Sequence, residues 1–202
     1  HFPGGMDHKD SKFWFSNRLD DVYTIPLRSL YSSTLKNLFF GGRCLSATHL
    51  AMASTRVMAT CAVIGHGIGT AMAHCKTVGK LPASLGAGDI EQLKQTLLRE
   101  DAFLPGTSNR DPDDLARTAK ATAGSSLPTF EPENVLDGVA RSWHGSNHQW
   151  RSKSLNPTDC RLELDFGKSR NVSRVHLCFD TGLNRGMTLT HQDSVNAKMI
   201  EG

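Results

Sequence analysis

Two different spacings of apolar residues divide the chain. Between residues 55 and 98 apolar positions recur every three or four residues, whereas beyond residue 160 they alternate with polar ones. The first spacing is typical of a helix with one buried face and the second of a half-buried strand. A turn-rich stretch at Pro105–Asn109 separates them. We therefore predict an α+β chain of two modules, residues 1–104 and 105–202.

The first module is expected to contain a strand, a tight turn and a helix. Leu38–Phe40 is a short apolar run that ends at Gly41 and Gly42, which suits a buried strand leaving a sheet. A helix should follow from about Thr55 to Cys75. Its buried stripe would consist of residues at helical spacing, namely Val57, Cys61, Ile64 and Ile68.

A second helix is predicted to begin at Asp89. Gln92, three residues further on, would complete a capping box, and apolar residues at helical spacing would form the buried stripe: Ile90, Leu93, Leu97 and Leu98. Within the earlier helix, Gly65, Gly67 and Gly69 resemble a dinucleotide-binding fingerprint only superficially, because the third glycine comes one residue early. We expect these glycines to let a neighbouring strand pack closely.

The second module is predicted to be an all-β sandwich. Leu162–Phe166 and Val175–Phe179 alternate apolar with polar or small residues, as half-buried strands do. The five residues from Gly167 to Asn171 form a loop of hairpin-like length. Short alternating strands joined by such loops favour a sandwich.

Composition limits the partners. The formal net charge of +3 contains no block of like charges, so we expect neither nucleic acid nor an anionic membrane as a partner. The longest apolar stretch, Ala62–Ala73, is too short to span a bilayer. An odd number of cysteines without C-x-x-C spacing predicts reduced, buried thiols, with no disulfide frame and no metal site: Cys44, Cys61, Cys75, Cys160 and Cys178.

The stretch from Asn37 to Cys61 carries the chemistry. Two glycines at a strand end let the backbone approach a ligand, and a helix starting downstream directs N–H groups and a positive dipole to the same place. Arg43 and Arg56 flank these features, and a guanidinium can bind phosphate or carboxylate in bidentate fashion. An anionic or electron-rich group is expected there, with surface salt bridges as the alternative for the arginines.

Residues 37–75, together with Tyr23–Tyr31, resemble the C-terminal part of bacterial FAD-dependent oxidoreductases with a glutathione-reductase-like flavin fold. The resemblance implies the strand-turn-helix part of a Rossmann-like FAD-binding domain. It places a glycine-arginine turn beside the ribityl and pyrophosphate part of FAD, and a helix start at the pyrimidine edge of the ring. The residues implied to contact the cofactor are Gly41, Gly42, Arg43, Ser46, Arg56, Val57, Met58 and Thr60.

The same resemblance implies hydride or electron transfer between a small organic substrate and the flavin. His49 is the one candidate for a catalytic proton carrier, and a hydrogen-bonded structural histidine is the more common alternative. Cys44 and Cys61 are 17 positions apart and do not form a redox pair. Both ends read as cut, so we expect the missing N-terminal FAD-binding half of the same chain as partner, and poor FAD binding without it.

Residues 114–185 resemble a discoidin-like, galactose-binding-like domain, incomplete at its end. The matching features are Ala119–Ser126, Pro132–Gly138, Trp143, Trp150–Ser152 and Leu162–Gly167. Such domains often bind glycans, so the alternative function is a carbohydrate-binding module with a structural N-terminal segment. Three side chains could then contact a sugar: Trp143, His144 and Trp150. We favour the reading in which Trp150 fills the core and the domain braces the enzyme. Calcium binding at the Asp137–Gly138 turn is a minor alternative.

Overall fold

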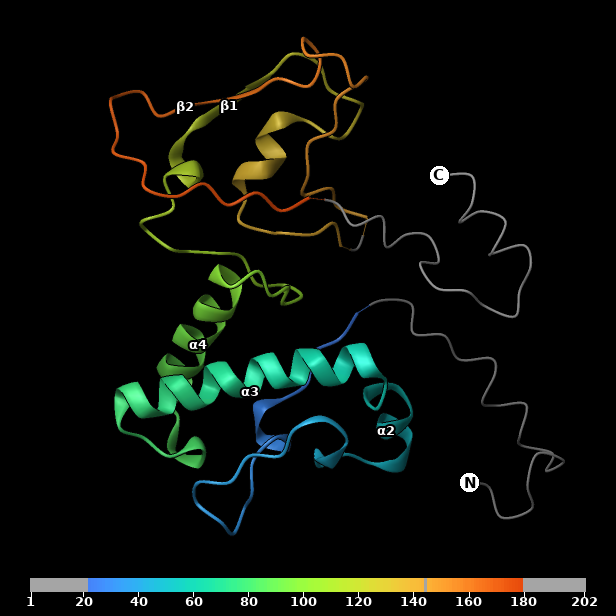
Figure 1. The fold of residues 1–202 in the computed structure, drawn as a ribbon, viewed down its shortest axis with the longest axis vertical. Coiled ribbons are helices and arrows are strands. Elements are labelled where there is room, and N and C mark those ends of the chain that lie inside the picture. The colour runs from blue at the N-terminus through green and yellow to red at the C-terminus, as the bar shows by residue number, and fades with distance from the viewer. Residues whose placement is uncertain (1–21, 144, 180–202) are drawn as a thin grey trace, which may run out of the picture. The chain divides into compact units, whose positions relative to one another are not determined.

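The computed structural model of the protein describes residues 22–143 and 145–179, drawn in colour in Figure 1. The chain divides into two compact units, His1–Asn109 and Arg110–Gly202, called unit 1 and unit 2 below. Among the described residues, unit 1 is mainly helical and unit 2 contains the strands.

Among residues 22–109, unit 1 holds three α-helices: α2 (His49–Thr55), α3 (Met58–Val78) and α4 (Ala87–Arg99). Short 3-10 helices lie between and before them: η2 (Leu27–Ser29), η3 (Gly42–Cys44) and η4 (Pro82–Ser84). Thr48 begins α2, because its hydroxyl accepts a hydrogen bond from the N–H of Ala51. The sequence reading missed this helix.

The long helix α3 confirms the predicted helix but starts and ends later than expected. Val57 is extended (φ −72°, ψ 150°), so α3 starts at Met58. The chain bends by 93° between α2 and α3. Gly79 ends it in the left-handed conformation. Ile64 and Ile68 are buried as predicted, but Cys61 is half-buried and Val57 is exposed because it precedes the first turn.

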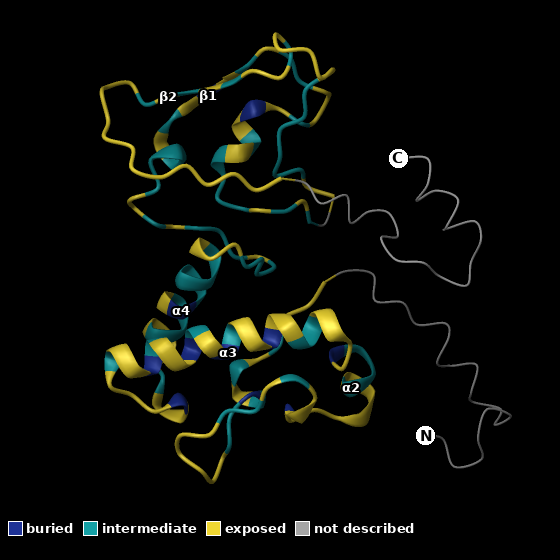
Figure 2. Ribbon diagram, in the orientation of Figure 1, coloured by how far each residue is buried: buried dark blue, intermediate teal, exposed yellow. Residues whose placement is uncertain are grey.

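The core of unit 1 lies under one face of α3 (Figure 2). Its buried members are Leu30, Leu45, Ile64 and Ile68, and the half-buried ones are Ile25, Leu27, Phe39 and Met52. The predicted strand at Leu38–Phe40 is wrong: the structure has a single antiparallel bridge between Tyr31 and Phe39. The chain turns back between these two residues, and no further ladder forms among the described residues on either side.

Asp89 connects α4 to the end of α3. It is the third residue of the helix after its N-cap, Gly86, and its carboxylate accepts the Gly86 N–H at 2.8 Å. The prediction that Asp89 begins the helix with Gln92 as partner is therefore wrong. Lys80 donates to both carboxylate oxygens, at 2.7 and 2.9 Å. The Lys80 ammonium first, and then the Gly86 N–H, lower the pKa of Asp89.

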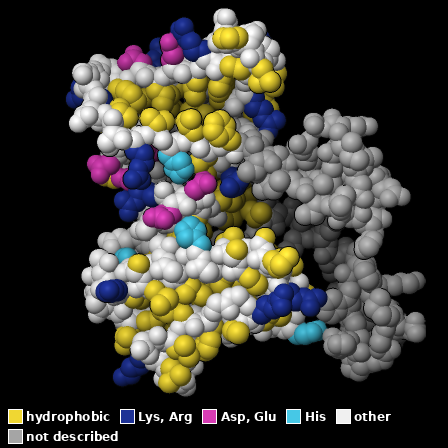
Figure 3. All heavy atoms as spheres, in the orientation of Figure 1, with side chains coloured by type: hydrophobic (Ala, Val, Ile, Leu, Met, Phe, Trp, Pro, Cys, Tyr) yellow, Lys and Arg dark blue, Asp and Glu magenta, His cyan; other side chains and the backbone are white. Residues whose placement is uncertain are grey.

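The other side of α3 is apolar but open. Met58, Val63 and Met72 are exposed, and Figure 3 shows apolar side chains gathered on the face of unit 1 that it draws. A Cβ added at any of three helical glycines would meet no described atom within 4 Å: Gly65, Gly67 and Gly69. The close packing predicted for these glycines is therefore not found within the part of the chain that the structure describes.

No single described helix is long and apolar enough to cross a membrane. The bent pair of α2 and α3 satisfies that criterion only when the two helices are taken together, by length and composition.

In its described part, residues 110–143 and 145–179, unit 2 contains one antiparallel pair of strands, β1 (Lys120–Ala123) and β2 (Leu162–Asp165). Two 3-10 helices, η5 (Leu115–Thr118) and η6 (Pro132–Leu136), accompany them. β2 confirms the first predicted strand. The second is wrong, because Val175–Phe179 forms no strand and its apolar side chains are exposed. The Rossmann-like and sandwich folds stay predictions.

The cysteines are free thiols, but only Cys75 is buried. Cys61 is half-buried, and the prediction of buried thiols is wrong for the three that are exposed: Cys44, Cys160 and Cys178. Burial first, and then the nearby Asp89 carboxylate, raise the pKa of the Cys75 thiol. Cys75 is therefore a packing residue of α3, not a reactive thiolate.

Candidate functional site

The glycine pair after the Tyr31–Phe39 bridge makes a turn directed at α3. Gly41 is extended, and Gly42 has φ +58°, a conformation that residues with a Cβ rarely adopt. A Cβ at Gly42 would lie 3.7 Å from the sulfur of Cys61, in the first turns of α3. The backbone of this turn therefore runs in direct contact with the helix.

Arg43 fastens the turn to the start of α3. Its Nε donates a hydrogen bond to the backbone carbonyl of Arg56 at 3.2 Å, across 13 positions of sequence. Both arginines are exposed. The bond brings two cationic residues to the place where the helix begins.

The N-terminus of α3 presents backbone donors. Val57, the N-cap residue, provides no side-chain cap, and Met58 is 82% exposed. None of the described residues accepts a backbone hydrogen bond from the N–H groups of Met58, Ala59 or Thr60. Such first-turn N–H groups, together with the dipole of a 21-residue helix, favour an anion.

Six predicted site residues are thus brought together by the turn and the helix start: Gly41, Gly42, Arg43, Arg56, Val57 and Met58. Thr60 is half-buried in the first turn of α3. Ser46 is exposed, and its N–H donates to the Ser29 carbonyl at 2.8 Å, so it is held by η2 and not by α3. His49 is exposed and is the first residue of α2.

Two contacts that position this region escaped the sequence reading. The hydroxyls of Tyr23 and Ser54 lie 2.6 Å apart and tie the beginning of the described chain to α2. No sequence pattern relates two residues 31 positions apart. The N-cap at Thr48 could have been found, because a threonine precedes a run of good helix formers.

The side chains of Trp150 and Asp137 are engaged within unit 2. The half-buried Trp150 donates its indole N–H to the Ser125 carbonyl at 2.9 Å, which supports a packing role. Trp143 forms a bridge with Ser146, while His144 lies outside the described residues. One Asp137 oxygen accepts the Val139 N–H and the other lies 2.5 Å from Nδ1 of His148. The carboxylate that calcium would need is therefore already partnered.

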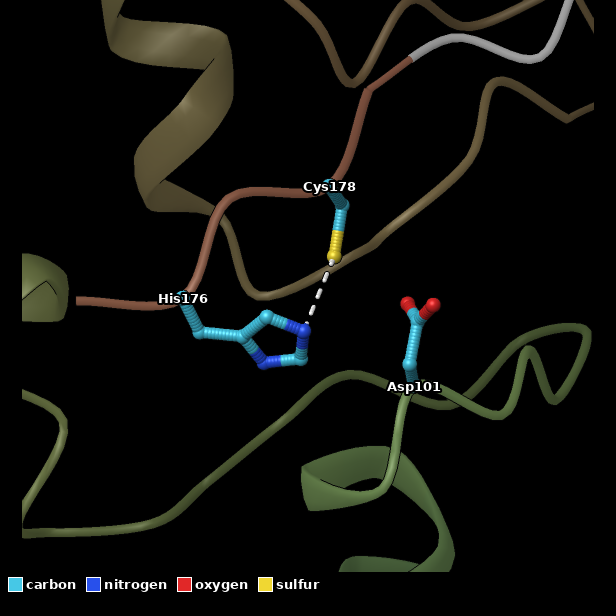
Figure 4. A group of neighbouring side chains, drawn as sticks. All are labelled: Asp101, His176 and Cys178. Atoms are coloured by element: carbon cyan, nitrogen blue, oxygen red, sulfur yellow. Dashed lines mark hydrogen bonds between the residues drawn. The ribbon is translucent and has the colours of Figure 1, made fainter. Parts of the chain in front are cut away.

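Figure 4 shows His176 and Cys178 of unit 2, with 4.0 Å between the imidazole Nε2 and the thiol sulfur. Asp101, drawn in the same picture, belongs to unit 1. Two exposed ligands from one extended segment provide half of the four that a structural zinc site uses, so this pair does not define a metal site.

One comparison with known proteins finds a match within the first unit. Residues 1–97 match the family model described as FAD dependent oxidoreductase. No curated protein matches the chain, and no solved structure does. The matched region contains the glycine turn, both arginines and the start of α3.

FAD is the cofactor that this family implies, and the activity is that of an oxidoreductase in general terms. The resemblance seen in the sequence of the first module is thereby confirmed at the level of the family. The residues present fit such a cofactor, because its pyrophosphate is an anion and the site combines the Arg43 guanidinium with first-turn N–H groups of α3 that no described residue accepts.

Proposed function

We propose that unit 1 forms one wall of the FAD site of an oxidoreductase. The observation that carries the proposal is the hydrogen bond from Arg43 to the Arg56 carbonyl, because it joins the glycine turn to the uncapped start of α3 within the matched region. Neither the turn nor the helix end alone would define a site.

Each part of this wall has a distinct task. Gly41 and Gly42 leave room for the ribityl and pyrophosphate part of the cofactor, and Arg43 supplies positive charge there. Val57, Met58 and Thr60 face the pyrimidine edge of the ring, where the helix dipole favours negative charge.

The flavin, when bound, supplies hydride or electron transfer with a small organic substrate. The residues of unit 1 position it and adjust the electrostatic potential around it. Arg56 joins the two parts of the wall through its backbone carbonyl, and Ser46 belongs to the segment that connects them.

The opposite wall, in this proposal, comes from an N-terminal FAD-binding half of the same polypeptide. Two features of α3 support it. The helix is apolar on the side facing away from its own core, with Val63 and Met72 exposed, and a helix that is apolar all round normally lies between two layers. Its open glycines, Gly65 and Gly69, would let a backbone approach closely.

Unit 2 is proposed to be a discoidin-like domain that braces the enzyme. The indole hydrogen bond of Trp150 to Ser125 supports bracing over sugar binding, since it directs the polar atom of that side chain inward. If the flavin test described below fails, a carbohydrate-binding function for unit 2 becomes the favoured alternative.

The first experiment measures the absorbance spectrum of the complete polypeptide, purified without added cofactor and then denatured. We expect a flavin spectrum at a stoichiometric level. A colourless protein that cannot be reconstituted with FAD would overturn the proposal.

The site itself is tested by Arg43→Ala in the complete polypeptide. Loss of the guanidinium should reduce retained FAD and weaken reconstitution about tenfold or more, as expected for a charge-assisted contact to phosphate. Lys76→Ala is the matched control, because Lys76 is an exposed cation near the opposite end of α3. Equal FAD retention by the two variants would remove Arg43 from the site.

A further inference from the structure

Three successive residues at the end of α2, Ser54, Thr55 and Arg56, each contact a different segment of unit 1. The carbonyl of Arg56 accepts the hydrogen bond from Arg43 described above. The carbonyl of Thr55 accepts a weak hydrogen bond from the thiol of Cys61, in the first turn of α3, at 3.9 Å. Two of the three residues are therefore fixed relative to the glycine turn and the start of α3.

The third residue, Ser54, is held by Tyr23. Their hydroxyls lie 2.6 Å apart, across 31 positions of sequence. Helix α2 has seven residues, and a helix this short does not persist in water by its own backbone hydrogen bonds. Its orientation therefore depends on tertiary contacts of this kind. Because the Tyr23 side chain is 43% exposed, burial of its ring secures it only in part, and the hydroxyl contact supplies the rest.

The end of α2 determines where the first turn of α3 lies. Only Arg56 and Val57 separate the two helices, which meet at 93°. A connection this short leaves little slack, so a displacement of the α2 end also moves the N-cap of α3. The electrostatic effect of a helix terminus falls off within its first turn, and a misplacement of about 1 Å is enough to weaken a positioned contact.

We propose that Tyr23 is a positioning residue of the flavin site, acting through Ser54 and α2 on the start of α3. The inference rests on the proposed function for its cofactor, and it adds a residue that lies outside both the glycine turn and α3. Reduced flavin carries negative charge at its pyrimidine edge, which a helix N-terminus stabilises. Loss of the Tyr23 hydroxyl should therefore disfavour the reduced flavin more than the oxidised one.

The first test needs no cofactor and measures amide hydrogen exchange of the chain by mass spectrometry. Tyr23→Phe removes only the hydroxyl, and it should speed exchange in the first turns of α3, where the Cys61 N–H donates to the Val57 carbonyl, about fivefold. Tyr31→Phe is the matched control, since Tyr31 packs edge-on against Phe39, and it should exchange like wild type there. Unchanged exchange in Tyr23→Phe would overturn the proposal.

The second test uses the complete polypeptide reconstituted with FAD. Tyr23→Phe should weaken FAD binding about fivefold and shift the midpoint potential of the bound flavin to a more negative value, whereas a purely stabilising role would leave that potential unchanged. Ser54→Ala should give the same shift, and the double variant no larger one, because the two hydroxyls form one contact. A wild type that binds no FAD would overturn the proposed function and this inference together. Bound flavin with equal potentials in wild type and Tyr23→Phe would overturn only the role of Tyr23.

Discussion

Arg43 and Arg56 are joined through a hydrogen bond of 3.2 Å from the Nε of the first to the backbone carbonyl of the second. The acceptor immediately precedes Val57, the N-cap residue of α3, so the bond fixes the glycine turn relative to the helix start. A cationic side chain used in this way holds the backbone and leaves the rest of its guanidinium available for an anion.

Gly42→Ala should destabilise unit 1, because the alanine would occupy a left-handed conformation at φ +58°. That conformation costs about 1–2 kcal/mol for a residue with a Cβ. Gly65→Ala is the control: it lies inside α3, where a Cβ meets nothing within 4 Å, and should raise the free energy of unfolding by about 0.5–1 kcal/mol. Urea unfolding followed by circular dichroism measures both. Equal effects of the two alanines would show that the turn is not held as described.

Asp89→Asn should flatten the acid dependence of unit 1 stability. The pKa of Asp89 is lowered in the folded chain, chiefly by Lys80, so its contribution is fully present above the unfolded value of about 4. That contribution is lost as the pH falls through the lower folded-state pKa. Thermal unfolding between about pH 6 and pH 2 should therefore show a smaller acid-induced loss in the variant than in wild type. Glu91→Gln, in the same helix, should behave like wild type, and a variant curve parallel to wild type would contradict the role of Asp89.

Gly124→Ala should lower the free energy of unfolding of unit 2 more than a substitution at an exposed position does. A Cβ there would lie 1.8 Å from the carbonyl oxygen of Thr158, which belongs to the backbone and cannot move aside freely. Overpacking of this kind costs about 3 kcal/mol. Tryptophan fluorescence in urea would report it, because Trp150 is bonded to Ser125, next to the substituted position. Thr122→Ala, on an exposed position of β1, should cost less than about 1 kcal/mol.

The helices were predictable where their pattern is local. Ile64 and Ile68 repeat at helical spacing, and α3 forms around them. The break at Val57 was not predictable, because Thr55 to Cys75 reads as one continuous helical pattern and only the bend between α2 and α3 interrupts it. Asp89 was assigned to the wrong capping position because glycine at the N-cap gives a weaker signal than a carboxylate.

Strands were less predictable than helices, because a strand needs a partner that the local sequence does not supply. Leu162–Asp165 finds β1, whereas Leu38–Phe40 makes one bridge and Val175–Phe179 makes no ladder among the described residues. The alternation of apolar residues is equally clear in β2 and in the last of these segments. Local pattern thus gives the tendency, and pairing depends on the rest of the chain.

The class of chemistry could be inferred from the sequence alone, since Gly41, Gly42, Arg43 and the run into α3 are contiguous and lie within the region that matches the FAD dependent oxidoreductase family. Only the tertiary structure decided which candidates meet: Arg43 reaches the Arg56 carbonyl, and Gly42 packs on Cys61, whereas Ser46 is held by Ser29. The physical reason is that side-chain identity and helical period are local properties, while a hydrogen bond between distant residues depends on how the connecting backbone folds.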